Sequence, residues 1–174
     1  MRTFHTSILK IITPVLILLL LNPVYPASSA SQDVTVTVTE TIQIKTIWKG
    51  TETTNPFTFN VYVGSWGEYY WPGEQGGLQI KSLSNVPVDL YVRAEGDLQG
   101  PGGIIPIENL KYANYGSGVP KTPFQKYYVL VKKHWKVENP TEAIIPVDLY
   151  LNIPPGTPPG IYSVNIYHIA VKSQ

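Results

Sequence analysis

Apolar and polar side chains alternate along the chain from residue 34. Threonine, glutamine and lysine fill the odd positions from 35 to 45, and large apolar residues recur at even ones. The apolar members of this pattern are Val34, Val36, Val38, Ile42, Ile44 and Trp48. A period of two that uses β-branched residues is typical of a β-strand. The pattern therefore predicts one long first strand over Val34–Trp48.

Further segments of strand character follow, separated by turn residues such as Trp71-Pro-Gly and Gly100-Pro-Gly-Gly. They cover residues 57–63, 77–83, 88–94, 127–137, 144–153 and 162–172. The stretch 96–126 is expected to be mostly irregular, with one strand near 104–107. No window has a helical period. Seven or eight strands with dense turn signals predict an all-β fold, a two-sheet antiparallel sandwich of jelly-roll-like or Ig-like type.

The first thirty residues differ from the rest. Arg2 and Lys10 flank a polar start, residues 11–21 are almost purely apolar, and the small residues Ser28 and Ala30 follow. The apolar run is shorter than the ~20 residues that a membrane helix needs. We therefore predict a secretory signal peptide over residues 1–30 and a secreted mature chain that starts at Ser31 and is not inserted in a membrane. An uncleaved N-terminal anchor is the alternative.

Composition narrows the function classes. Outside residues 1–30, acidic and basic residues are nearly equal in number and interspersed, so nucleic acid is not an expected partner. With no cysteine, a packed core or partner subunits must hold an exported fold without disulfides. Sixteen prolines and one methionine suit a thermophile, because proline lowers the entropy of the unfolded chain.

Catalytic and metal-binding groups are scarce. After residue 30 the histidines are His134 and His168, and both fall inside predicted strands, where catalytic groups are uncommon. Two histidines without a thiol do not make a convincing zinc site. Glu95 and Asp97 fit a calcium loop or solvated turn residues. We therefore expect no enzyme, no cofactor and no metal.

A short repeat occurs twice. Residues 87–92 read Pro-Val-Asp-Leu-Tyr-Val, and residues 146–151 read Pro-Val-Asp-Leu-Tyr-Leu. One interpretation is two strands at equivalent positions of facing or adjacent sheets. The other is a functional carboxylate pair, Asp89 with Asp148.

Aromatic residues cluster at Trp66, Tyr69, Tyr70 and Trp71. Flat aromatic faces beside carboxylates can stack on sugar rings, so these residues are the candidate site for a monomeric secreted carbohydrate-binding or cell-envelope adhesion module. The alternative is that they close one end of the sandwich core.

The predicted first strand is longer than one sandwich needs. Its 15 residues would span about 50 Å, against about 17–20 Å for a typical strand. Glu40 interrupts its apolar face. We therefore expect residues 31–40 to be a projecting N-terminal donor strand and residues 41–174 to be the sandwich domain.

A projecting strand with Val34, Val36 and Val38 on one face must be covered. Addition to a sheet edge of the next subunit would cover it. Because donor and acceptor lie at different places on one molecule, such contacts propagate head to tail. An ordinary first strand that bends between the two sheets of its own domain is the alternative.

Three features together resemble a known family. They are a Thr/Val-rich first strand after a signal peptide, the segment Tyr70-Trp-Pro-Gly-Glu-Gln-Gly-Gly to Val92, and Ile153-Pro-Pro-Gly-Thr-Pro-Pro-Gly-Ile-Tyr before the last strand. This combination resembles the archaeal bundling pilins, which are similar to the TasA and camelysin fibre proteins. The resemblance implies a jelly-roll-like sandwich whose N-terminal strand is donated to the next subunit of a surface filament in cell cohesion and biofilm. It implies a homopolymer that also meets cell-surface or matrix components, and no catalytic residue.

Overall fold

The computed structural model describes residues 35–53, 56–116 and 118–174. The chain divides into two units, Met1–Thr37 and Val38–Gln174, and the fold described here is that of the second. The predicted signal peptide over residues 1–30 and the candidate donor residue Val34 lie outside the described residues. Among the residues that are described, no helix is long and apolar enough to span a membrane.

Strands dominate the described part of the chain, with three short 3-10 helices between them. The strands are β1 (Ile44–Trp48), β2 (Thr51–Thr53), β3 (Phe57–Val63), β4 (Gly67–Trp71), β5 (Leu78–Ser82), β6 (Val88–Ala94), β7 (Leu98–Gly100), β8 (Gly103–Ile105), β9 (Leu110–Asn114), β10 (Val119–Pro123), β11 (Val129–Trp135), β12 (Ile144–Ile153) and β13 (Gly160–Lys172). The 3-10 helices are η1 (Gly73–Gln75), η2 (Ile107–Asn109) and η3 (Pro140–Ala143).

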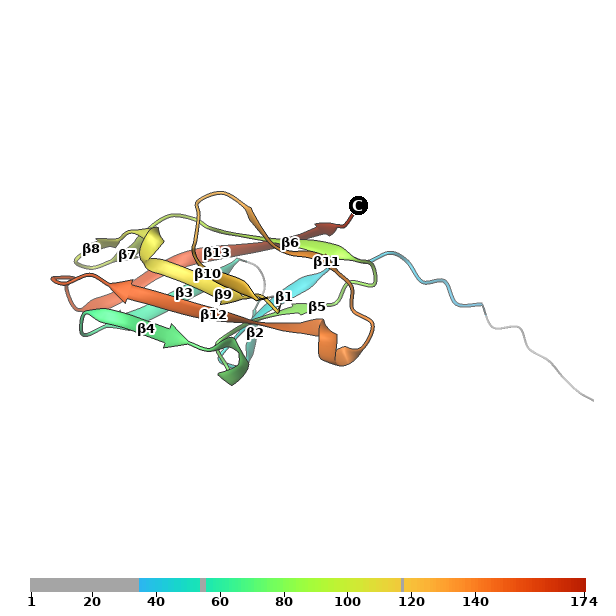
Figure 1. The fold of residues 1–174 in the computed structure, drawn as a ribbon, viewed down its shortest axis with the longest axis horizontal. Helices are drawn as coiled ribbons and strands as arrows, with labels where there is room; N and C mark the ends of the chain where they lie inside the picture. The colour runs from blue at the N-terminus through green and yellow to red at the C-terminus, as the bar shows by residue number, and fades with distance from the viewer. Residues whose placement is uncertain (1–34, 54–55, 117) are drawn as a thin grey trace, which may run out of the picture. The chain divides into compact units, whose positions relative to one another are not determined.

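These strands form two antiparallel sheets packed face to face (Figure 1), which confirms the predicted all-β sandwich. Over the described residues, the larger sheet has the order β10-β9-β12-β5-β1-β2, and β4 also pairs with β12. The smaller sheet has the order β11-β6-β13-β7-β8, and β3 also pairs with β13. The two longest strands, β12 and β13, therefore organise one sheet each.

Strict alternation along the strands produces the core between the sheets. In β3, Phe57, Phe59, Val61 and Val63 are buried while the residues between them are exposed. The strands β6 and β12 alternate in the same way. Because successive side chains of a strand point to opposite faces, one face of each strand supplies the core and the other faces solvent.

The end of the core next to β3 is aromatic. The ring centroid of Trp48 in β1 lies 5.6 Å from that of Phe57 and 5.3 Å from that of Phe59. Trp71 in β4 makes an edge-to-face contact with Phe59 at 5.4 Å between ring centroids. This cluster ties β1, β3 and β4 together across the two sheets.

The prediction of one strand over Val34–Trp48 is wrong for its described part, because β1 begins only at Ile44. Ladder pairing with β5 starts at Ile44, which lies opposite Ser82. Before Ile44, Leu83 and Asn85, which follow β5, still donate backbone hydrogen bonds to the carbonyls of Gln43 and Thr41. The backbone nitrogens of Gln43 and Thr41 donate to the side chains of Ser84 and Asn85 rather than to backbone carbonyls. The alternation therefore continues beyond the end of the ladder.

The expectation of a mostly irregular stretch over 96–126 is also wrong. It contains β7, β8, β9 and β10, and the strand expected near 104–107 is β8, followed at Ile107 by η2. These strands have three to five residues. Such short segments show too few periods of alternation to stand out in the sequence.

The two copies of the repeat belong to β6 and β12, which lie in different sheets. The part of the first interpretation that places the copies in two strands of facing sheets is confirmed. In each copy the valine and leucine face the core, and the aspartate and tyrosine face outward.

Replacing Gly73 with alanine is expected to destabilise the sandwich by about 1–3 kcal/mol, because overpacking forces the backbone to move. A Cβ there would lie 2.3 Å from the backbone nitrogen of Val147 and 2.8 Å from its oxygen. Gly96→Ala is the matched control, since a Cβ at Gly96 meets nothing within 4 Å. Urea denaturation measures both, and equal effects would contradict the close approach of η1 to β12.

Candidate functional site

The segment before β1 carries two exposed valines. Thr35–Gln43 belongs to no strand. Val36 is 76% exposed and Val38 is 78% exposed. Both are candidate donor residues, and the third, Val34, is outside the described residues. Large apolar side chains this exposed at alternate positions are the kind of surface that natural proteins usually cover.

Asn85 holds the end of this segment on the sandwich. Its side-chain nitrogen donates to the carbonyl of Thr39 at 2.7 Å, and its side-chain oxygen accepts from the backbone nitrogen of Thr41 at 2.7 Å. Its own backbone nitrogen donates to the carbonyl of Thr41 at 3.2 Å. One side chain thus imitates the backbone of a neighbouring strand. The anchoring contacts begin at Thr39, one residue after Val38.

Further contacts support the same boundary. The Ser84 hydroxyl accepts from the backbone nitrogen of Gln43 at 3.0 Å. The ammonium of Lys172, at the end of β13, lies 2.9 Å from a carboxylate oxygen of Glu40. This ion pair is exposed, so it contributes little by itself. The interruption of the apolar pattern at Glu40 coincides with the place where the chain meets the sandwich.

The structure divides the four candidate aromatic residues between two faces. Tyr69 and Trp71 alternate toward the core side of β4 and are half-buried, with their rings stacked at 6.2 Å. Tyr70 points to the outer face and is 51% exposed, and Trp66 in the preceding loop is 73% exposed. The four rings therefore do not form one platform, and the carbohydrate-binding hypothesis is left with Trp66 and Tyr70.

Tyr70 belongs to a row of side chains on the outer face of the larger sheet. Its ring stacks on Tyr150 of β12 at 4.7 Å between centroids. The ammonium of Lys121 lies 4.3 Å from the centre of the Tyr150 ring and 2.5 Å from the carboxylate of Glu68. Cross-strand stacking and cation–π contacts of this kind stabilise a sheet face.

Neither His134 nor His168 is arranged as the histidine of a hydrolase triad. The exposed His134 contacts the hydroxyl of Ser173 at 3.0 Å, and that hydroxyl donates to Asp89 at 2.8 Å. The serine therefore lies between the histidine and the carboxylate, whereas a triad needs the histidine in the middle. The buried His168 contacts the hydroxyl of Tyr115 at 3.0 Å, and burial lowers the pKa of His168 to about 3.

The repeated aspartates are not brought together. Asp89 faces outward from the smaller sheet, where it accepts from the backbone nitrogen of His134 at 2.7 Å. Asp148 faces outward from the larger sheet and accepts from the backbone nitrogen of Gly73 at 2.9 Å. The alternative of a functional Asp89–Asp148 pair is therefore wrong.

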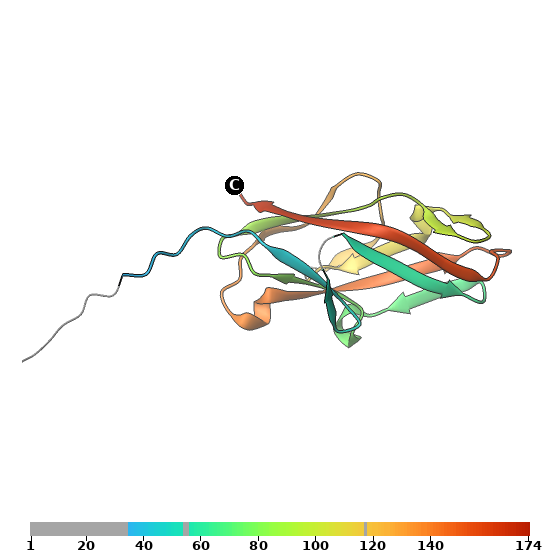
Figure 2. The ribbon, with the colours of Figure 1, turned by 180° about the vertical axis from the view of Figure 1, so that it is seen from behind.

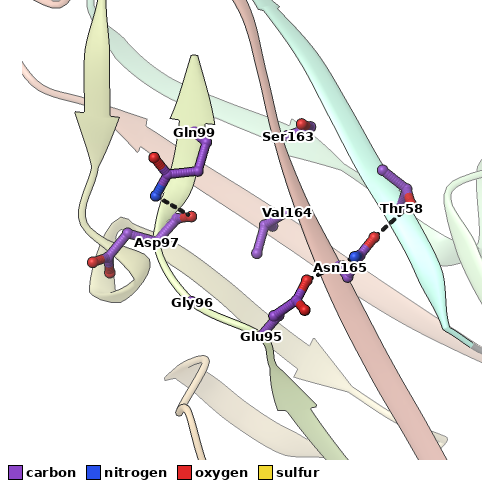
Figure 3. Close-up of a pocket in the computed structure, with 8 residues that line it drawn as sticks. All are labelled: Thr58, Glu95, Gly96, Asp97, Gln99, Ser163, Val164 and Asn165. Atoms are coloured by element: carbon purple, nitrogen blue, oxygen red, sulfur yellow. Dashed lines mark hydrogen bonds between the residues drawn. The ribbon is translucent and has the colours of Figure 1, made fainter.

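A polar hollow of about 290 Å³ lies on the outer face of the smaller sheet (Figure 3). Glu95 and Asp97 line it, but both carboxylates already have donors. Glu95 accepts from the Asn165 side chain at 2.7 Å. Asp97 accepts from the backbone nitrogen of Ile107 and from Lys126, each at 3.0 Å, and these two contacts lower the pKa of Asp97.

The described residues contain no group of three or more histidine, cysteine, aspartate or glutamate side chains that could hold a metal ion. The two carboxylates in the hollow act as local structural acceptors for a turn and a loop. The hollow therefore gives the calcium interpretation no support.

Comparison with known proteins gives no match, whether to a protein-family model, to a curated protein or to a solved structure. The resemblance to the bundling pilins therefore stays a prediction from the sequence.

Proposed function

We propose that this chain is a structural subunit of an extracellular filament, assembled by donation of its N-terminal strand to the next subunit. One observation carries the proposal. Val36 and Val38 are more than three-quarters exposed in an extended segment that enters no strand. A threonine–valine alternation is a strand pattern, so the segment has the sequence of a strand without a partner strand.

Burial of the valines supplies the driving force. Each fully buried valine contributes about 1.5–3 kcal/mol, and the backbone hydrogen bonds of an added strand give further affinity. The donor segment and a sheet edge are different surfaces, so the contact is head to tail and repeats along a filament. Such a fibre needs no catalytic group. It would act in cell cohesion through contacts with components of the cell surface or of the extracellular matrix.

Two double variants of the mature chain from Ser31 test the proposal. Val36→Asp with Val38→Asp places charges on the valine face, where burial in a partner would leave them unpaired. Thr35→Asp with Thr37→Asp is the matched control, because it adds the same charge to the opposite face. The loss of two buried valines, about 3–6 kcal/mol, is expected to weaken subunit association by more than about a hundredfold.

Negative-stain electron microscopy and sedimentation velocity at high protein concentration measure whether each protein forms filaments or stays monomeric. We expect filaments from the unchanged chain and from the threonine control, and monomers from the valine variant. Discrete small particles from the unchanged chain, or filaments from the valine variant, would refute strand donation.

A further inference from the structure

An acceptor for a donated strand has to be a sheet edge. Within the described residues, the larger sheet ends in β10, β2 and β4, and the smaller sheet ends in β11, β8 and β3. Each of these strands presents a row of backbone groups on one side. Natural proteins protect such edges with proline, lysine, bulges or short length, so the protection of each edge shows whether it is available.

Four of the six edges are protected. β10 contains Pro120 and Pro123 and has a register shift. β11 has two register shifts and carries Lys132 and Lys133. β2 and β8 have three residues each. None of these edges offers a long, regular row of backbone donors and acceptors.

The edge of β3 is long and lacks these protective features. Its seven residues include no proline and no charged residue. They pair with Gly160–Ile166 of β13 without a register shift, and Figure 2 shows the two strands side by side, β3 in green and β13 in red. The other regular edge, β4, has five residues and carries Glu68. Of the described edges, β3 is therefore the one best suited to accept a strand.

Exposed apolar side chains gather at the C-terminal end of β3. Tyr62 is 70% exposed and Ile161, its direct cross-strand neighbour, is 61% exposed. Trp66 follows β3 in the chain and is 73% exposed. Grouped exposed apolar residues mark surfaces that contact another molecule, and here they border the unprotected edge.

We propose that the free edge of β3 binds residues 31–39 of a second copy of this chain. The inference rests on the proposed function and adds the acceptor to it. The incoming segment matches the edge in pattern: its valines continue the buried row that contains Phe59 and Val61, and its threonines continue the outer row that contains Thr58 and Asn60. Its nine residues also cover the seven of β3.

Disulfide trapping tests this acceptor directly, because the chain has no cysteine. Asn60→Cys on the exposed face of β3 is combined with Thr37→Cys, and in a second protein with Thr35→Cys, which moves the register by two residues. Neighbouring strands place opposite Cα atoms about 4.5–5.5 Å apart, within the range of a disulfide. Glu68→Cys on β4 and Lys133→Cys on β11 replace Asn60→Cys in the control pairs.

After mild oxidation, we expect a ladder of covalent multimers on a non-reducing gel from the Asn60 pairs and almost none from the control pairs or from single-cysteine proteins. Hydrogen exchange gives a readout that does not depend on register. Amides of residues 57–63 are expected to exchange more slowly in filaments than in the monomeric valine variant, whereas those of β10 and β11 keep their rates.

The outcomes separate the two proposals. Filaments that cross-link through Glu68 or Lys133, or that leave the exchange of residues 57–63 unchanged, would overturn the β3 assignment while strand donation stands. Absence of filaments from the unchanged chain would overturn both.

Discussion

Replacing Phe59 with alanine is expected to lower the free energy of unfolding by about 3–5 kcal/mol. Phe59 is fully buried. Its ring makes edge-to-face contacts with Trp48 at 5.3 Å and with Trp71 at 5.4 Å. Truncation removes these contacts and leaves a cavity that rigid rings cannot collapse to fill. Because β1, β3 and β4 meet at this ring, the loss weakens both sheets at once.

Tyr62→Ala is the matched control for that experiment. It removes another large aromatic ring from the same strand, but Tyr62 is 70% exposed. Its effect should stay within about 0.5 kcal/mol. Urea denaturation at 25 °C, on proteins carrying the valine-face aspartates so that all are monomers, measures both changes. Similar losses for the two variants would contradict the assignment of inner and outer faces along β3.

The free energy of unfolding is also expected to fall as the pH drops below about 6.5, the ordinary pKa of histidine. Burial lowers the pKa of His168 to about 3, so the folded protein keeps this ring neutral while the unfolded chain takes up a proton. The unfolded state then binds more protons, and stability decreases as the pH falls from about 6.5 to about 3. One proton gives a slope of about 1.4 kcal/mol per pH unit.

The histidine can be separated from the carboxylates by its pH window. Two lysine side chains, Lys45 and Lys81, lower the pKa of Glu52 from 4.5 to about 2, so Glu52 loses its contribution only below about 4.5. Between pH 4.5 and 6.5 the slope is therefore assigned to His168. His168→Gln should flatten it, and the exposed-site control His134→Gln should keep it. A slope unchanged by His168→Gln would contradict the buried neutral ring.

Much of the fold could be predicted because long strands show their alternation in the sequence. The expected strands at 57–63, 88–94 and 144–153 coincide with β3, β6 and β12. Short strands could not be predicted in this way. The strands β7 and β8 have three residues each, too few for a period to be recognised. The start of β1 depends on where β5 ends as its partner, a tertiary contact that no local pattern contains.

For the candidate sites too, the sequence could predict only what local alternation shows. Tyr69 and Trp71 have odd numbers and Tyr70 has an even one, so alternation would have separated the rings if 67–71 had been recognised as a strand. The contact of His168 with Tyr115 joins residues 53 positions apart and has no local signal. Asn85 is similar, since its role in holding Thr39 and Thr41 appears only when two distant segments are side by side.

If the proposed filament forms, the way in which Asn85 and β5 hold the start of the domain would determine how each subunit responds to mechanical force. In a filament under tension, the pull would enter each sandwich near Thr39 and continue along β1. All five residues of β1 pair with β5, and the hydrogen bonds of an antiparallel pair run perpendicular to the strands. A pull along the strand loads these bonds together in shear instead of opening them one at a time. The same attachment that presents the valines would therefore give the fibre tensile strength.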